Sequence, residues 1–228
     1  MFNILQLFLL IFTTLLHHKS TTNPNPTYSS DYVSYEGVGS TFAVHIGPNI
    51  SKFLIWISTL YQALYLFLQA SSPASIATFF PQISTLINTL PLTPVSMIGY
   101  ALMMVGGLGR IWCYRTLGKF FTFELTIRNS HKLIKNGPYA YVRHPSYTFA
   151  FILTIGMFLI HRRIGNFFPN TYWTDIMFGS GAFLTCCLLL LFFLTKRVIN
   201  EEKELSKAFG KEWNEYASKT KRFIPTII

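Results

Sequence analysis

The residues best suited to chemistry lie in a short polar stretch, 136–147, at the entrance to a long apolar run. It reads Asn-Gly-Pro-Tyr-Ala-Tyr-Val-Arg-His-Pro-Ser-Tyr and combines charged, aromatic and turn-forming side chains. The Gly-Pro pair predicts a turn, and Pro145 suits the first position of a helix because it has no N–H to leave unpaired. Arg143 and His144 are therefore expected at a helix N-terminus, where N–H groups and the helix dipole favour anions. A simple interfacial anchor of a membrane helix is the alternative interpretation of this pair.

A second polar group, Arg197, Glu201 and Glu202, follows the last apolar run. Glu202 falls on the same helical face as a series of apolar residues, which are Val198, Leu205, Phe209, Trp213 and Tyr216. A carboxylate on an apolar face must be paired or must meet a polar ligand, which favours a functional role for Glu202. Glu201 lies four residues after Arg197, so an ion pair along the helix is the alternative for these two.

The composition predicts that membrane-spanning helices position these residues. Half of the 228 residues are hydrophobic and only 12% are charged, which is typical of an integral membrane protein rather than of a soluble domain. We expect an all-α fold with about five transmembrane helices, a cytosolic catalytic loop and a C-terminal amphipathic helix. The predicted spans are 1–16, 52–69, 95–112, 147–160 and 176–194. The chain then divides into N-terminal membrane segments with a polar loop (1–112) and a catalytic core (113–228).

The first apolar run has a rival interpretation as a secretory signal. No basic region precedes it and no small-x-small cleavage site follows it, so we favour a retained span. Residues 71–94 contain four prolines and predict a broken helix. The third predicted span carries Gly99, Gly106, Gly107 and Gly109, and glycines in a membrane helix allow another helix to approach closely. Gly210 predicts a local irregularity in the charged tail.

The formal charge of +10 is concentrated in the loop before the fourth span and in the tail. Two spans separate these regions, so both are expected on the same, cytosolic side. The sequon at Asn49 would then also be cytosolic and carry no glycan. We assign the basic charge to membrane topology, and no nucleic-acid partner is expected. The three cysteines, Cys113, Cys186 and Cys187, have no metal-binding spacing, so no metal is expected.

Taken in order, the motifs resemble the isoprenylcysteine carboxyl methyltransferase family over residues 117–225. The pattern is His-x-Leu-Ile-x-x-Gly-Pro-Tyr-x-x-x-Arg-His-Pro-Ser-Tyr from His131, then Arg-x-x-x-Glu-Glu from Arg197, then Phe-Gly-x-x-Trp-x-x-Tyr from Phe209. The resemblance implies an enzyme of the endoplasmic reticulum membrane. It would transfer a methyl group from S-adenosylmethionine to the C-terminal carboxylate of a prenylated cysteine.

The resemblance also implies roles for particular residues. Arg197 and Glu202 would lie nearest the reacting groups. The implied cofactor-binding set is His131, Leu133, Ile134, Gly137, Tyr139, Arg143, His144, Pro145, Tyr147 and Glu201. One departure stands out, because the family usually has a small residue where this chain has Phe149. That ring would either narrow the cofactor pocket or face lipid.

This chemistry is compatible with the residues themselves. A C-terminal carboxylate is already ionised at neutral pH, so an enzyme must strip it of water and orient it rather than deprotonate it. Arg197 could hold such a carboxylate through two parallel hydrogen bonds, and Glu202 could hold that arginine or the amino group of the cofactor. Arg143 could bind the carboxylate of the cofactor, and Tyr139 or Tyr147 could stack on adenine.

Three alternatives remain open at this point. A phospholipid N-methyltransferase would use the same cofactor, but its amine acceptor would leave a carboxylate-orienting arginine without purpose. A sterol reductase dependent on NADPH is similar around the Arg-His-Pro motif, although the Glu201-Glu202 pair argues against it. A non-catalytic membrane protein that binds prenylated partners is kept open by Phe149. The oligomeric state is not predicted.

Overall fold

The computed structural model describes residues 4–25, 45–71, 92–124, 132–161 and 180–225, with the backbone alone for 180–187 and 189–191. Every regular element in these ranges is helical, which confirms the predicted all-α class. The helices are α1 (Ile4–Ser20), α3 (Gly47–Ser71), α5 (Pro94–Leu117), α6 (Pro145–His161), α8 (Ser180–Phe209) and α9 (Lys211–Lys219), with short 3₁₀ turns η4 (Gly118–Phe120) and η5 (Gly137–Ala140). An isolated parallel bridge joins Val142 to Lys221.

Two helices of the described part, α3 and α5, are long and apolar enough to cross a membrane. The helices α1 and α6 are apolar but shorter, at 17 residues each. Large apolar side chains cover the outer surface of α1 and α3, including Phe8 (61% exposed), Phe53 (64%) and Leu60 (64%). Contiguous exposed apolar surface of this kind is typical of a protein that faces lipid.

The helices α5 and α6 pack with their backbones nearly in contact, as predicted for the glycines of the third span. A Cβ added to Gly106 would lie 2.5 Å from the backbone nitrogen of Leu153, and one added to Gly156 would lie 2.6 Å from that of Met103. Gly99 faces the side chain of Ile160 in the same way. Glycine is therefore required at these positions for the two helices to approach this closely.

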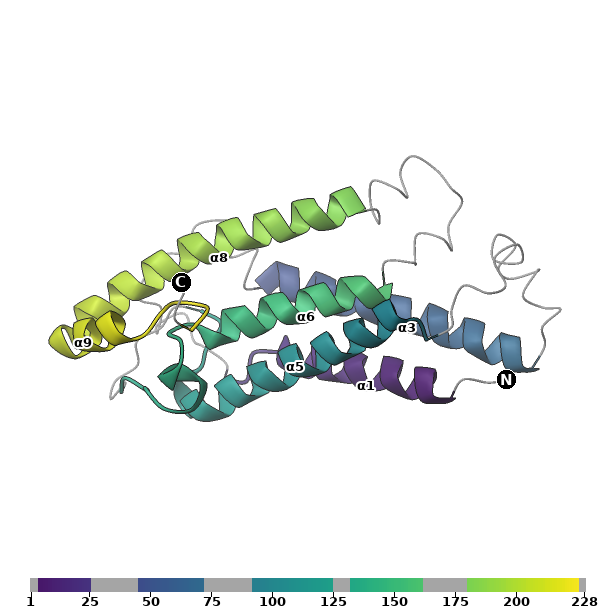
Figure 1. Ribbon diagram of the computed structural model, residues 1–228, viewed down its shortest axis with the longest axis horizontal. Coiled ribbons are helices and arrows are strands. Elements are labelled where there is room, and N and C mark those ends of the chain that lie inside the picture. Colours follow the sequence, from purple (N-terminus) through teal and green to yellow (C-terminus); the bar gives the residue numbers. More distant parts are fainter. Residues whose placement is uncertain (1–3, 26–44, 72–91, 125–131, 162–179, 226–228) are drawn as a thin grey trace.

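Four helices meet in one apolar core. Its buried members are Leu10 of α1, Ile55 of α3, Tyr100 and Met103 of α5, and Leu153 and Ile160 of α6. Figure 1 shows these four helices side by side, with α8 lying along the bundle and α9 at its far end. The C-terminal end of α1 is fixed to α5, because Arg110 Nε donates to the Ser20 carbonyl at 2.8 Å and the Tyr114 hydroxyl donates to the same oxygen.

The tail differs from the prediction in one respect. We expect the fifth span to end at residue 194 and a charged, helical tail to follow it; in the structure the apolar run and the first part of this tail form one helix, because α8 continues without a break from Ser180 to Phe209. The Glu, Lys and Leu residues that follow the apolar run are good helix formers and propagate the helix. The break falls at Gly210, whose φ of 52° favours glycine, and α9 begins after it. The broken helix predicted for residues 71–94 cannot be compared with the structure over most of its length, because residues 72–91 lie outside the described residues.

Candidate active site

The predicted turn before α6 is present and places Tyr139 inside the protein. Gly137 has a φ of 57°, and a Cβ there would approach Thr116 Oγ1 to 3.0 Å, so a larger residue would be strained by the backbone conformation and crowded by Thr116. The turn η5 then buries Tyr139 against Cys113 and its neighbours on α5. Burial raises the pKa of the Tyr139 phenol well above its usual value, so this phenol stays neutral at physiological pH.

Glu202 of α8 is the point at which the two polar clusters of the sequence meet. Its Oε1 accepts hydrogen bonds from Arg143 Nε at 3.0 Å and lies 3.2 Å from His144 Nε2. Arg222 Nη2 donates to Oε2 at 2.8 Å, and Arg222 Nε lies 3.1–3.2 Å from both oxygens. Burial by itself would raise the pKa of Glu202, but hydrogen bonds from His144, Arg222 and Arg143 outweigh it and hold that pKa well below its usual range. The carboxylate is therefore ionised, and both of its oxygens accept hydrogen bonds from side chains of the protein.

Residues 220–223, here called the C-terminal strap, run alongside the Arg-His-Pro motif. The backbone N–H of Arg143 donates to the Lys221 carbonyl at 2.7 Å, and that of His144 donates to the Arg222 carbonyl at 2.9 Å. The Thr148 hydroxyl donates to the Phe223 carbonyl at 2.9 Å. Arg143 and His144 lie at the N-terminus of α6 as predicted, and their own backbone N–H groups donate to the strap. The strap supplies backbone carbonyls that accept from both groups.

Arg143 has several acceptors within the chain. Besides Glu202, its Nη1 donates to the carbonyls of Ala217, at 2.7 Å, and of Thr220. Its side chain is only 10% exposed. These contacts fix Arg143 between α8 and the C-terminal segment. From the sequence we expect this arginine to bind the carboxylate of the cofactor instead.

Tyr147 connects Arg197 to Glu201. Arg197 Nε donates to the Tyr147 hydroxyl at 2.8 Å, and that hydroxyl donates to Glu201 Oε2 at 2.8 Å. Arg197 Nη2 also donates to the carbonyl of Phe123. The tyrosine ring stacks on the ring of His144, with centroids 5.7 Å apart. The sequence suggests two roles for Glu202, to hold Arg197 or to hold the amino group of the cofactor. In the described residues, its side chain instead contacts Arg143, His144 and Arg222.

Most of the predicted site residues thus lie around the start of α6. The structure brings together Tyr139, Arg143, His144, Pro145, Tyr147, Arg197, Glu201 and Glu202. Leu133 and Ile134 are half-buried in the segment that leads to Gly137. His131 lies outside the described residues. In the described part no group of three or more His, Cys, Asp or Glu side chains could hold a metal ion.

Sequence reasoning did not assign Arg222 or Tyr216 to the site. The Tyr216 hydroxyl donates to the Tyr139 carbonyl at 2.6 Å and so fixes the turn from α9. Tyr216 falls in the Trp-x-x-Tyr motif, which could have indicated it. Arg222 is one of several basic residues in the tail, and nothing in its spacing separates it from the others.

Phe149 packs within the protein, against α5. A Cβ on Gly109 would lie 2.3–2.5 Å from the Phe149 ring, so the ring rests directly on this glycine. Phe149 also packs against the cluster of Cys113, Tyr114 and Tyr139. The large side chain is accommodated by a glycine on the facing helix, next to the buried ring of Tyr139.

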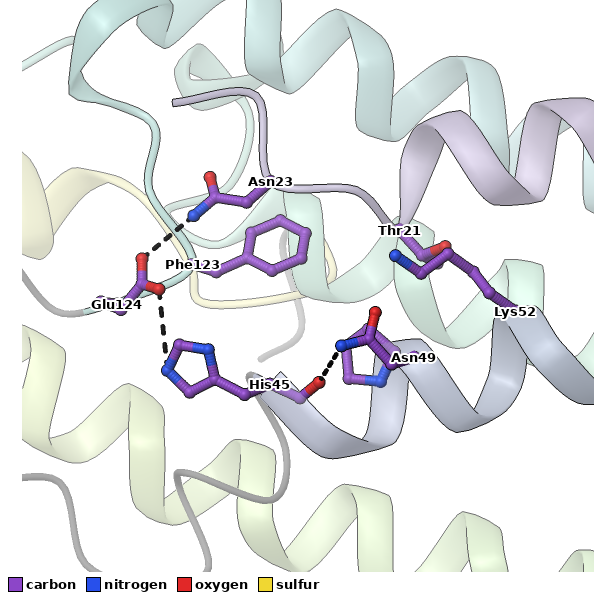
Figure 2. A pocket seen from close by; sticks show the side chains of 8 residues that line it. Thr21, Asn23, His45, Asn49, Lys52, Phe123 and Glu124 are labelled. Atoms are coloured by element: carbon purple, nitrogen blue, oxygen red, sulfur yellow. Dashed lines mark hydrogen bonds and ion pairs between the residues drawn. The ribbon is translucent and has the colours of Figure 1, made fainter. Parts of the chain in front are cut away.

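A small cavity of about 120 Å³ lies where residues that follow α1 and residues at the start of α3 meet Phe123 and Glu124. Its lining consists of Thr21, Asn23, His45, Pro48, Asn49, Lys52, Phe123 and Glu124. Figure 2 shows Glu124 between two of them, where it accepts from Asn23 Nδ2 at 3.0 Å and lies 3.7 Å from His45 Nε2. Because the Phe123 carbonyl accepts from Arg197, the cavity adjoins the candidate active site.

Comparison with known proteins finds one family. Residues 97–207, which contain α5, α6 and the segment of α8 up to Lys207, match the isoprenylcysteine carboxyl methyltransferase (ICMT) family. The predicted family resemblance is confirmed. The match to the ICMT family includes Arg143, His144, Arg197 and Glu202, and it ends before α9 and the C-terminal strap.

Individual relatives carry the same description. A probable protein-S-isoprenylcysteine O-methyltransferase of Oryza sativa subsp. indica is 30% identical over 136 residues, which cover 58% of this chain and 62% of the relative. The protein-S-isoprenylcysteine O-methyltransferase of Schizosaccharomyces pombe is 34% identical over 97 residues, or 42% of this chain and 34% of the relative. That of Saccharomyces cerevisiae is 26% identical over 151 residues, or 65% and 56%. The chain thus spans about three fifths of the length of the plant relatives that it matches.

Proposed function

We propose that this protein is a membrane methyltransferase that moves a methyl group from S-adenosylmethionine to the C-terminal α-carboxylate of a prenylated cysteine. The observation that carries the proposal is the meeting of two segments far apart in the chain. Arg143, His144 and Tyr147 at the start of α6 contact Glu202, Glu201 and Arg197 of α8 through hydrogen bonds of 2.8–3.2 Å. All six residues lie in the segment that matches the ICMT family.

The residues at the start of α6 fit such a cofactor. S-Adenosylmethionine presents two cationic groups, a carboxylate and an adenine ring, so its site needs a carboxylate, hydrogen-bond donors and aromatic faces. Glu201, with a side chain 27% exposed, suits the ammonium group, and the rings of Tyr139 and Tyr147 suit adenine. When bound, S-adenosylmethionine supplies an electrophilic methyl group on a cationic sulfur.

The chain contributes orientation and removal of water. Arg197 lies at the end of the apolar part of α8, where a prenylated cysteine held in the bilayer would present its carboxylate, and its guanidinium can orient that group. Tyr147 holds Arg197 Nε at 2.8 Å and so limits the positions that the guanidinium can take. No proton has to be removed from the acceptor, since a carboxylate is ionised at neutral pH.

We further propose five spans in the endoplasmic reticulum membrane, with the site facing the cytosol. The apolar surface of α1 and α3 supports a lipid environment. The end of α1 contacts the C-terminal part of α5 through Arg110 and Tyr114, and Arg110 also donates to the Ser146 carbonyl at the start of α6. These ends therefore lie on one side of the bundle, together with the basic residues of the tail, as a cytosolic face requires.

The experiment is transfer of labelled methyl from S-adenosylmethionine to N-acetyl-farnesylcysteine by membranes that contain the full chain. Arg197→Ala is compared with Lys196→Ala, which removes a neighbouring exposed cation. We expect base-labile label from the wild type and from Lys196→Ala, and a loss of about 100-fold in Arg197→Ala, because the acceptor carboxylate loses the group that orients it towards the methyl group.

The product distinguishes the alternatives. Equal activity of Arg197→Ala and Lys196→Ala would contradict the role of Arg197. Base-stable label in phospholipid would indicate an amine acceptor instead of a carboxylate. Absence of S-adenosylmethionine binding would overturn the methyltransferase proposal and favour a reductase or a non-catalytic protein.

A further inference from the structure

The C-terminal strap contacts the Arg-His-Pro motif more extensively than any role in membrane topology requires. Two backbone hydrogen bonds join its carbonyls to the N–H groups of Arg143 and His144. A third contact joins Thr148 to the Phe223 carbonyl. The Phe223 ring lies 6.2 Å from the ring of His144. Since the family match ends at residue 207, that match does not assign the strap a function.

Arg222 is the side chain that attaches the strap to α8. It meets both oxygens of Glu202, at 2.8 and 3.1–3.2 Å, in a forked arrangement that only a guanidinium can provide. Glu202 in turn holds Arg143 and His144. The hydrogen bond to Glu202 raises the pKa of Arg222 above its already high value, so this cation is permanent.

The charges around Glu202 explain why two arginines are present. The side chains of Arg143 and Glu202 are 10% and 14% exposed, so each would be costly to leave without its partner. Arg143 alone already balances the carboxylate. Arg222, which is 45% exposed, adds a second cation to Glu202 from the solvent side, and Glu201 brings a second carboxylate to 3.9 Å from His144.

We propose that Arg222 is a positioning residue of the cofactor site, which acts through Glu202 to hold residues 220–223 against Arg143 and His144. This inference rests on the proposed function, because it assumes that the start of α6 binds S-adenosylmethionine. Loss of Arg222 releases one side of Glu202 and loosens the strap. The affinity for S-adenosylmethionine then falls, while the affinity for the prenylated acceptor, which contacts Arg197, is unchanged.

The test compares Arg222→Ala and Arg222→Lys with Lys219→Ala in the full-length protein. Lys219 is exposed at the end of α9 and lies three residues before Arg222. Equilibrium binding of S-adenosylmethionine and KM for N-acetyl-farnesylcysteine are measured on the same membranes. We expect the affinity for S-adenosylmethionine to fall about 10-fold in Arg222→Ala. This is a typical coupling between a ligand and a residue that acts on the site without touching the ligand. The lysine variant should recover part of this loss, and KM for the acceptor should stay within a factor of two.

Hydrogen exchange of the Arg143 and His144 amides gives a readout that needs no cofactor. We expect faster exchange of these two amides in Arg222→Ala than in the wild type or in Lys219→Ala, since the carbonyls that accept from them belong to the strap. Unchanged exchange would overturn the inference. It would also be overturned if KM for N-acetyl-farnesylcysteine rose by the same factor as the dissociation constant for S-adenosylmethionine, because that result indicates general damage. If the wild type binds no S-adenosylmethionine but exchange still rises in Arg222→Ala, the proposed function fails and Arg222 is a structural residue.

Discussion

The replacement of Glu202 by glutamine tests the contact network at the start of α6. Glutamine keeps the shape of the side chain and one acceptor oxygen but removes the charge. Arg143 then loses the counter-charge at 3.0 Å while its side chain remains 90% covered, and it retains the carbonyls of Ala217 and Thr220. Breaking a buried ion pair by removing one partner costs about 3–5 kcal/mol. Because these acceptors remain and Arg222 is half exposed to solvent, we expect the lower end, about 3 kcal/mol.

The assay is thermal unfolding of the purified protein in detergent, followed by the loss of helical signal. For a chain of this size, about 3 kcal/mol corresponds to a fall in Tm of roughly 6–12 °C. Glu204→Gln is the matched control on the same helix. The side chain of Glu204 is 17% exposed and pairs with Lys207, three residues further along the helix. The lysine is 72% exposed, so the pair is open to solvent on one side and contributes at most about 1 kcal/mol.

The comparison between the two variants decides the outcome. If Glu202→Gln melts within about 1 °C of Glu204→Gln, the carboxylate does not hold Arg143 and the strap in the way that the structure indicates. Recovery of stability in Glu202→Gln when Arg222 is also replaced by glutamine would support the network, because the double variant leaves one cation fewer without a partner.

Three further predictions concern acid, packing and topology. The pKa of Glu202 in the folded protein lies below its unfolded value of about 4.3. The stability that the ionised carboxylate contributes is therefore complete above about pH 4.3 and is lost as the pH falls towards the folded pKa. The Tm of the wild type should fall more steeply than that of Glu202→Gln below about pH 4.5. Gly106→Val should destabilise the protein by about 1–3 kcal/mol, because a Cβ at this position would lie 2.5 Å from the backbone nitrogen of Leu153. Val105→Ile, on the exposed face of the same helix, is the control and should leave the Tm unchanged. Equal Tm values for the two variants would refute this packing. Asn49 should carry no glycan in microsomes, and a loss of mass on glycosidase treatment would place the start of α3 in the lumen.

The sequence predicts local structure well where a single residue type determines the backbone. Gly137 and Pro145 bound the turn and the start of α6 as expected, and Gly210 separates α8 from α9. The glycines of α5 also predict close packing, although the sequence does not show that Gly106 meets Leu153 or that Gly109 meets Phe149. Those partners depend on the relative rotation of two helices.

Pairing between distant charged residues is not predictable in the same way. Glu202 is correctly expected to need a partner, since its helical face is otherwise apolar. Its partners are Arg143 and Arg222, which lie 59 and 20 residues away, and neither separation follows a helical or strand period. The strap is likewise invisible in the sequence, because its contacts with Arg143 and His144 use backbone groups that any residue possesses.

The close packing of α5 on α6 has a consequence for how force passes through the protein in a bilayer. Where backbones touch at Gly106 and Gly156, one helix cannot slide past the other without lifting away from it. If both helices cross the bilayer as proposed, lateral pressure from the acyl chains would displace them together. A change in membrane thickness or tension would then tilt this pair of helices relative to α8. The hydrogen bonds that Tyr147 and Glu202 make between the start of α6 and α8 would be lengthened or broken by such a tilt.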